Sequence, residues 1–141
     1  MEFSLTPKSL PGETARRLMA CNAATERFGL SLTAAEAAEL AESRGRVLRD
    51  TGRVEFSGGV LPRLAMAFCD SPWAEAETWA ETLQALQELF YHLKNDTGLS
   101  DDDLMAAMRR TYDGPAHGST ALLADRLSDR PEEWEQEDED D

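Results

Sequence analysis

The sequence predicts an all-α fold, a compact bundle of five to six helices around a long central helix at about residues 72–95. Three observations support this fold class. Apolar residues in the central stretch recur every three or four positions, which is the spacing of one face of an α-helix. Helix-capping and helix-breaking residues divide the rest of the chain into segments of helical length. The alternating pattern of a β-strand is confined to two short stretches.

The central stretch has a regular apolar face. This expected buried face consists of Trp79, Leu83, Leu86, Phe90 and Leu93. Asp70 or Ser71 is expected to cap the N-terminus of the helix, with Pro72 in the first turn, where a missing backbone N–H costs nothing. A second, weaker apolar stripe runs beside the first. We therefore expect other helices to pack against the central helix from two sides.

Local signals define five further helices. Thr33 and Glu36 form a capping-box pattern, Gly29 ends the segment before it, and serines precede the last two helices as expected N-caps. The expected helical ranges are 12–28, 34–50, 60–69, 100–112 and 119–127. Residues 53–56 alternate in polarity and predict a short extended or β segment.

The charge of the chain is strongly acidic and unevenly distributed. The formal net charge is −14, from 28 acidic and 14 basic residues. Residues 132–141 hold eight acids and no base, so the remainder has 20 acids against 14 bases, or −6. We expect one helical domain at residues 1–130 and a disordered acidic tail at 131–141. This balance argues against binding to nucleic acid or to anionic membranes, which both need a basic surface.

The sequence also predicts a cytoplasmic location. No apolar run approaches the roughly 18 residues of a membrane span, and the first residues lack the pattern of a signal peptide. Cys21 and Cys69 lie in apolar-patterned segments and are expected to be free thiols in a reducing compartment. No motif indicates a cofactor.

Polar residues on apolar faces mark the candidate site. Asn22 and Arg44 both lie on stripes expected to face the core. A buried guanidinium needs a partner, and Glu55 and Asp70, the latter beside Ser71, are the candidate acids. Two interpretations remain open. Either Arg44 forms a buried polar tie between a helix and a loop, or these residues surround a polar pocket for a small anionic ligand.

Other potentially reactive residues have simpler explanations. Glu88 and His92 are four positions apart on one helix face, which is more typical of an exposed side-chain pair than of a metal site with three or four ligands. His117 lies in a glycine-flanked loop without a recognisable nucleophile or acid beside it. We therefore predict no catalytic residue and no metal ligand.

Several short segments together resemble a known family. They are RVEF at 53–56, FCDSP at 68–72, ETL at 81–83, FYHLKN at 90–95, SDDDL at 100–104 and GS at 118–119, with further likeness at Asn22, 28–30 and 42–44. Over about residues 15–127 the chain resembles a family of small bacterial proteins that is a domain of unknown function. The resemblance implies a mainly helical cytoplasmic domain. It implies no activity, cofactor or catalytic residue.

The sequence favours a non-catalytic helical interaction module or adaptor. Its partner would be a protein with a basic surface, because like charges are steered apart. The alternative is a small-ligand sensor or enzyme that uses the polar pocket around Arg44 and Asp70. A mimic of nucleic acid ranks third, because most of the excess charge lies in the tail. A homodimer through Trp73, Trp79 and Tyr91 also remains open.

Overall fold

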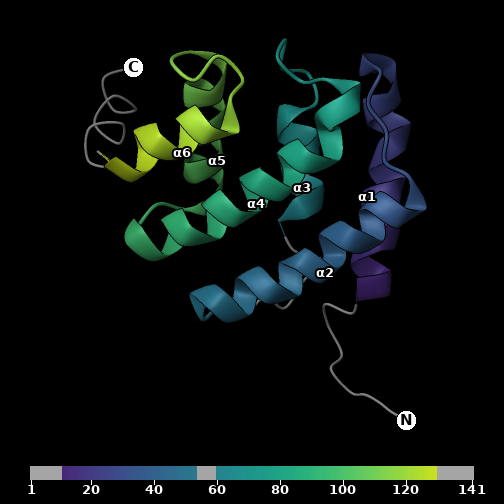
Figure 1. The fold of residues 1–141 in the computed structure, drawn as a ribbon, viewed down its shortest axis with the longest axis horizontal. Coiled ribbons are helices and arrows are strands. Elements are labelled where there is room, and N and C mark those ends of the chain that lie inside the picture. Colours follow the sequence, from purple (N-terminus) through teal and green to yellow (C-terminus); the bar gives the residue numbers. More distant parts are fainter. Residues whose placement is uncertain (1–10, 54–59, 130–141) are drawn as a thin grey trace.

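The computed structural model describes residues 11–53 and 60–129, and this part of the chain contains helices but no strand (Figure 1). The predicted all-α fold class is confirmed. The six α-helices are α1 (Pro11–Thr25), α2 (Ala34–Thr51), α3 (Leu61–Phe68), α4 (Trp79–Asp96), α5 (Asp101–Asp113) and α6 (Thr120–Asp129). Short 3₁₀ helices follow α1 at Glu26–Phe28 and precede α4 at Ala76–Thr78. The strand predicted at 53–56 lies outside the described residues from position 54 onward.

Local capping fixes the ends of α2, as the sequence predicted. The Thr33 hydroxyl accepts a hydrogen bond from the Glu36 backbone N–H at 3.1 Å, and the Glu36 carboxylate accepts one from the Thr33 N–H at 2.9 Å. Gly52 ends α2 in the left-handed conformation with φ 71°, and Gly29 ends the 3₁₀ helix after α1 in the same conformation with φ 80°. Glycine adopts this conformation without the steric penalty of a side chain.

The predicted start of the central helix is wrong. Residues 72–75 form a turn and an extended segment, and α4 itself begins at Trp79. The Ser71 hydroxyl accepts a hydrogen bond from the Trp73 backbone N–H at 3.2 Å and donates one to the Asp113 carboxylate at 2.7 Å. These two bonds hold the segment against α5. At 18 residues, α4 is as long as α2 and not longer.

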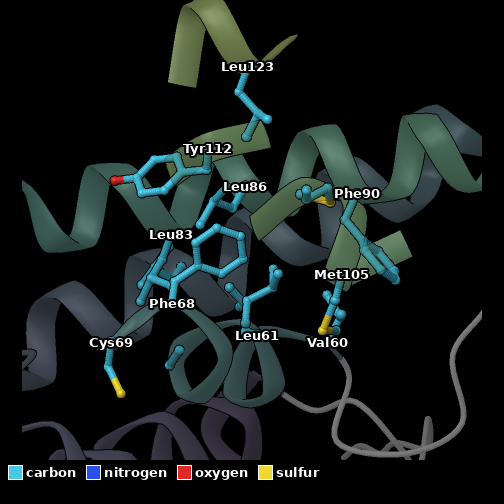
Figure 2. Close-up of a cluster of buried hydrophobic side chains, with 14 of the residues drawn as sticks. Val60, Leu61, Phe68, Cys69, Leu83, Leu86, Phe90, Met105, Tyr112 and Leu123 are labelled. Atoms are coloured by element: carbon cyan, nitrogen blue, oxygen red, sulfur yellow. The ribbon is translucent and has the colours of Figure 1, made fainter. Parts of the chain in front are cut away.

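The central position of α4 is correct, because it packs against α2, α3, α5 and α6. Every residue of its predicted inner face is at most 2% exposed. Figure 2 shows Leu83 and Leu86 beside Phe68 of α3 and Tyr112 of α5, whose rings meet edge to face at a centroid distance of 5.3 Å. The first helix, α1, completes the bundle by packing on α2 and α3.

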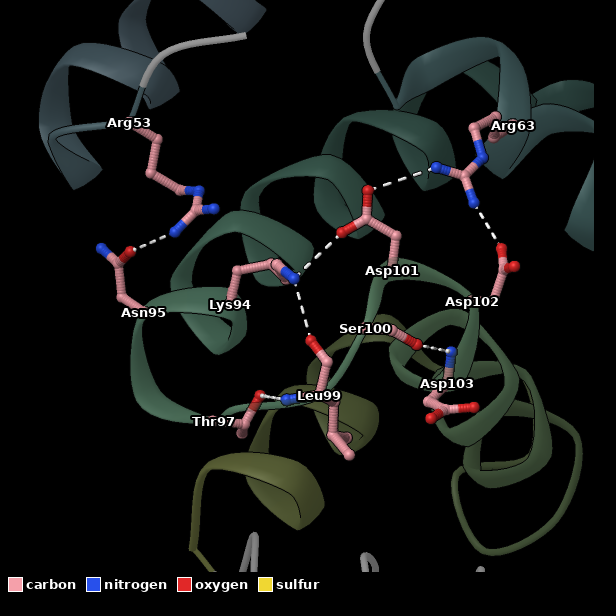
Figure 3. A network of polar contacts seen from close by, with 10 residues as sticks. All are labelled: Arg53, Arg63, Lys94, Asn95, Thr97, Leu99, Ser100, Asp101, Asp102 and Asp103. Carbon is pink, nitrogen blue, oxygen red and sulfur yellow. Dashed lines mark hydrogen bonds and ion pairs between the residues drawn. The ribbon is translucent and has the colours of Figure 1, made fainter.

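A polar network joins the ends of four helices (Figure 3). Lys94 of α4 donates to the Leu99 carbonyl at 2.8 Å and pairs with Asp101 at 3.0 Å. Arg63 of α3 pairs with Asp101 at 3.2 Å and also with Asp102. The side-chain amide of Asn95, also in α4, donates a hydrogen bond to the Thr51 carbonyl at the end of α2. The acidic first turn of α5 therefore holds α3 and α4 in place.

Candidate functional site

The predicted site residues divide into separate places in the fold. Asn22 lies on α1, half-buried, and its amide makes two hydrogen bonds to the backbone of Leu32, donating to the carbonyl at 3.0 Å and accepting from the N–H at 2.9 Å. This pairing satisfies the backbone N–H and carbonyl of Leu32, which lies in the loop that leads into α2. Asn22 is thus a structural tie between a helix and a loop.

Arg44 lies in the middle of the buried face of α2, and only 2% of the residue is exposed. This burial agrees with its position on the apolar stripe. Of the two acids predicted to pair with it, Glu55 falls outside the described residues, and Asp70 is exposed and binds Arg109 of α5. The buried tie of Arg44 to Glu55 therefore stays a prediction.

Asp70 and Ser71 belong to a cluster that we call the Asp113 junction, which consists of Asp70, Ser71, Trp73, Arg109 and Asp113. The Asp113 carboxylate accepts hydrogen bonds from the Ser71 hydroxyl and from Nε of Arg109, each at 2.7 Å. Nη1 of Arg109 donates to the Ala67 carbonyl and to Asp70, again at 2.7 Å. The junction therefore fixes the segment after α3 to the last turn of α5.

Trp73 extends this junction to the loop before α6. Its indole N–H donates to the Asp113 carbonyl at 3.2 Å, and its ring meets His117 edge to face at 5.8 Å. Gly118 has φ 78°, and a Cβ atom there would lie 2.4 Å from Cβ of Trp73. His117 also has a positive φ, 51°. Trp73 is 42% exposed, yet these contacts hold it on several sides. The junction therefore fixes the position of an exposed aromatic side chain.

Electrostatics at the junction follow from these contacts. The hydrogen bond from Arg109 lowers the pKa of the Asp70 carboxyl below its ordinary value.

The candidate nucleophiles near the junction are not activated. Burial raises the pKa of the Cys21 and Cys69 thiols, so both are poor nucleophiles near neutral pH. The Asp113 carboxylate is occupied by two donors and has no histidine among its hydrogen-bond partners, which argues against a role in activating Ser71 as a nucleophile.

An acidic groove lies between α2 and α4. It has a volume of about 600 Å³ and is lined by Glu36, Glu39, Leu40, Glu42, Ser43, Arg46, Ala80, Glu81, Gln84, Ala85 and Glu88. Five glutamates and one arginine give its lining a formal charge of −4. Neither Arg44 nor Asp70 lines this groove.

The carboxylates of the groove differ in their partners. Glu36 is engaged in the cap of α2, and Glu88 accepts a hydrogen bond from Gln84 at 2.7 Å. The side chains of Glu39, Glu42 and Glu81 form no hydrogen bond or ion pair with any described residue. These three charges are exposed and available to a cation from outside the chain.

Sequence reasoning missed several of these residues. Arg109 lies within the helix predicted at 100–112, and Asp113 follows it, without a further signal. Of the groove glutamates, the sequence singles out only Glu36, for its capping box, and Glu88, for its pair with His92. Gln87 of α4 is fully buried, and its amide N and O have no hydrogen-bond partner in the described residues. Its place beside the apolar stripe, three residues before Phe90, is the signal that could have drawn attention to it.

The described residues offer little support for other classes of site. No three His, Cys, Asp or Glu side chains within 11–53 and 60–129 are grouped so as to hold a metal ion. The exposed His92 ring lies 2.8 Å from the Glu88 carbonyl oxygen, in its own helix. Trp79 and Tyr91, considered for a dimer interface, are buried in the core. None of the described helices has the length and apolar character needed to cross a membrane.

Comparison with known proteins gives a family without an assigned activity. A family model described as a family of unknown function (DUF6323) matches residues 17–138 of this 141-residue chain. No curated protein and no solved structure matches the chain. The match confirms the resemblance to a domain of unknown function and continues beyond residue 127, where the resemblance was expected to end. The chain therefore belongs to the family of unknown function DUF6323.

Proposed function

We propose that the chain is a non-catalytic interaction module or adaptor of the cytoplasm that binds a basic segment of a partner protein. The observation that carries this proposal is the groove between α2 and α4, of about 600 Å³, which is lined by three glutamates whose side chains pair with none of the described residues. The two free thiols, Cys21 and Cys69, suit a reducing compartment.

The groove favours a cation-bearing partner on electrostatic grounds. Its only basic residue, Arg46, donates to Ser43 at 2.9 Å and leaves four of the five negative charges without a counter-charge in the lining. Two unit charges 4 Å apart attract by about 4 kcal/mol at an effective dielectric constant of 20, a typical value near a protein surface. Lysine or arginine side chains of a partner would gain part of this energy by replacing solvent counter-ions.

The size and shape of the groove favour a protein segment. Two adjacent helices of 18 residues each form its walls, so the glutamates are presented along rigid elements. Glu39 and Glu42 come from α2, and Glu81 comes from α4. A helix or extended segment with basic residues on one side would meet carboxylates on both walls.

The test compares two charge-reversal variants of equal net charge. One carries Glu39→Lys, Glu42→Lys and Glu81→Lys in the groove. The matched control carries Glu26→Lys, Glu77→Lys and Asp125→Lys at exposed positions that do not line it. A partner is first captured from the native host with the full chain, purified, and its affinity for each variant is measured at two salt concentrations.

We expect the groove variant to bind at least about tenfold more weakly, which corresponds to about 1.4 kcal/mol. The control and a chain lacking residues 132–141 should retain affinity within about threefold, which is under 1 kcal/mol. An equal loss in both triple variants would show that net charge alone matters and would refute the assignment to the groove. Binding that does not weaken as salt is raised would refute the electrostatic basis of the proposal.

A further inference from the structure

A second groove is formed by α1, α3 and α5, none of which lines the acidic groove. Its volume is about 650 Å³, and we call it the α3/α5 groove. It is lined by Cys21, Pro62, Arg63, Met66, Ala67, Asp102, Met105, Ala106 and Arg109. The lining is mostly apolar, with charged residues only from α3 and α5.

Two methionines give this groove an adaptable apolar surface. Met66 of α3 is 47% exposed, although it belongs to a short helix whose other large apolar residues are buried. Met105 of α5 also lines the groove, with 7% of the residue exposed at the edge of the core. Because methionine is unbranched and polarizable, such surfaces adjust to the side chains of a bound helix. Leaving Met66 exposed costs apolar burial that a partner could recover.

Arg109 supplies one fixed polar position in the groove. Three acceptors hold its Nε and Nη1 atoms, namely Asp113, Asp70 and the Ala67 carbonyl, and its side chain is 24% exposed. Its Nη2 atom donates to no described residue. A guanidinium fixed in this way presents its remaining N–H groups in a defined direction, which suits a carboxylate.

We propose that the α3/α5 groove binds an amphipathic helix of a partner protein, which packs apolar side chains on Met66 and Met105 and presents one carboxylate to Nη2 of Arg109. The apolar lining favours a helix with apolar side chains on one face. The N–H groups of Nη2 favour a carboxylate on that face. This surface differs in chemistry from the acidic groove, so the chain can hold two different segments as an adaptor.

The surroundings limit the partner to few acidic residues. Four aspartates already bind the two arginines of the groove: Asp70, Asp101, Asp102 and Asp113. A run of acids, such as residues 132–141 of this chain, would be repelled by these aspartates. The lining itself holds Arg63 and Arg109 against Asp102, a formal charge of +1, which disfavours a basic segment. A mainly apolar helix face with a single carboxylate fits both restrictions.

The test selects the partner chemistry directly. A displayed library of 16-residue helical peptides is selected on the full chain and counter-selected on the Met66→Glu variant, which places a charge on an exposed part of the groove. We expect enriched peptides to carry apolar residues at spacings of three, four and seven with one Asp or Glu. No enrichment over the variant, or enrichment of basic peptides, would overturn the proposal.

A synthetic form of the leading peptide then locates the site. With methionine methyl groups labelled by ¹³C, we expect NMR shifts of Met66 and Met105 but not of the fully buried Met108. Changing the peptide carboxylate to an amide should weaken binding about tenfold in the natural chain and much less in Arg109→Lys. Shifts confined to other methionines, or equal binding of both peptides, would contradict the assignment.

This inference is independent of the proposed function. The triple-lysine variant of the acidic groove should bind the selected peptide with unchanged affinity, because the two grooves share no lining residue. Loss of peptide binding in that variant would overturn the separation of the two surfaces. Loss of basic-partner binding alone leaves the α3/α5 groove unaffected.

Discussion

Replacing Asp113 by alanine should destabilise the fold by about 1.5–3 kcal/mol, because it removes the acceptor on which the Asp113 junction depends. The Ser71 hydroxyl is buried, with 6% of the residue exposed, and losing its acceptor costs about 1–2 kcal/mol. The pair with Arg109 is partly exposed, at 24% and 31%, so solvent screening limits its contribution to about 0.5–1 kcal/mol.

The prediction is checked by urea unfolding followed by tryptophan fluorescence, with thermal unfolding in parallel. For a chain of this length the midpoint temperature should fall by roughly 5–12 °C. Asp125→Ala is the matched control, because Asp125 is an exposed helical aspartate with no hydrogen bond or ion pair among the described residues. It should change the free energy of unfolding by less than about 0.5 kcal/mol.

A double-mutant cycle separates the Ser71 contact from the rest. Ser71→Ala and Asp113→Ala should couple by about 1 kcal/mol, because each removes one end of the same 2.7 Å hydrogen bond. Additive effects within about 0.3 kcal/mol would show that this contact contributes nothing. In that case the placement of residues 71–75 would need another cause, and the explanation given for the late start of α4 would be refuted.

Three further predictions concern single positions. Gln87→Met should raise the free energy of unfolding by about 1 kcal/mol, because it replaces a buried amide without a described partner; a loss of stability in urea would refute this. Gly118→Ala should lower it by more than about 2 kcal/mol, because φ is 78° and the new methyl group would overlap Trp73; unchanged unfolding would contradict the close approach. Because Arg109 lowers the pKa of Asp70 in the folded state, this carboxyl stabilises the fold above about pH 4, and its contribution is lost as the pH falls further. Asp70→Asn should therefore weaken the acid dependence of stability below pH 4, and identical pH profiles would refute the linkage.

The helices that the sequence predicts well are those with local end signals. Thr33 and Glu36 satisfy each other across three residues, and Gly52 adopts the left-handed conformation that its position suggests. Each of these interactions lies within one turn of the chain, so the residues needed to predict it are adjacent in sequence. The same holds for Ser100, which caps α5 through the Asp103 N–H at 3.1 Å.

The start of α4 shows where local reasoning fails. Ser71 followed by Pro72 is a good local pattern for the start of a helix. The Ser71 hydroxyl nevertheless donates to Asp113, 42 positions along the chain, and Trp73 bonds the same residue. A tertiary contact thus outweighs a capping preference worth only about 1 kcal/mol. Nothing near Ser71 in the sequence indicates this partner.

The candidate site was predictable only in part, for the same physical reason. Asn22 and Arg44 could be identified because a polar residue on an apolar stripe is visible within one helix. The acidic groove could not, because Glu39 and Glu81 become neighbours only when α2 and α4 pack together. Periodicity gives the face of each helix but does not say which helices are adjacent.

The position of the glutamates also changes how the net charge should be understood. Residues 1–131 carry a formal charge of −6, and the lining of the acidic groove alone carries −4. In the α3/α5 groove, by contrast, each arginine is paired with two aspartates. Two thirds of the net negative charge of residues 1–131 therefore lies in the lining of one groove. A partner that recognises this surface responds to a local field between two helices, which a count of charges along the sequence does not reveal.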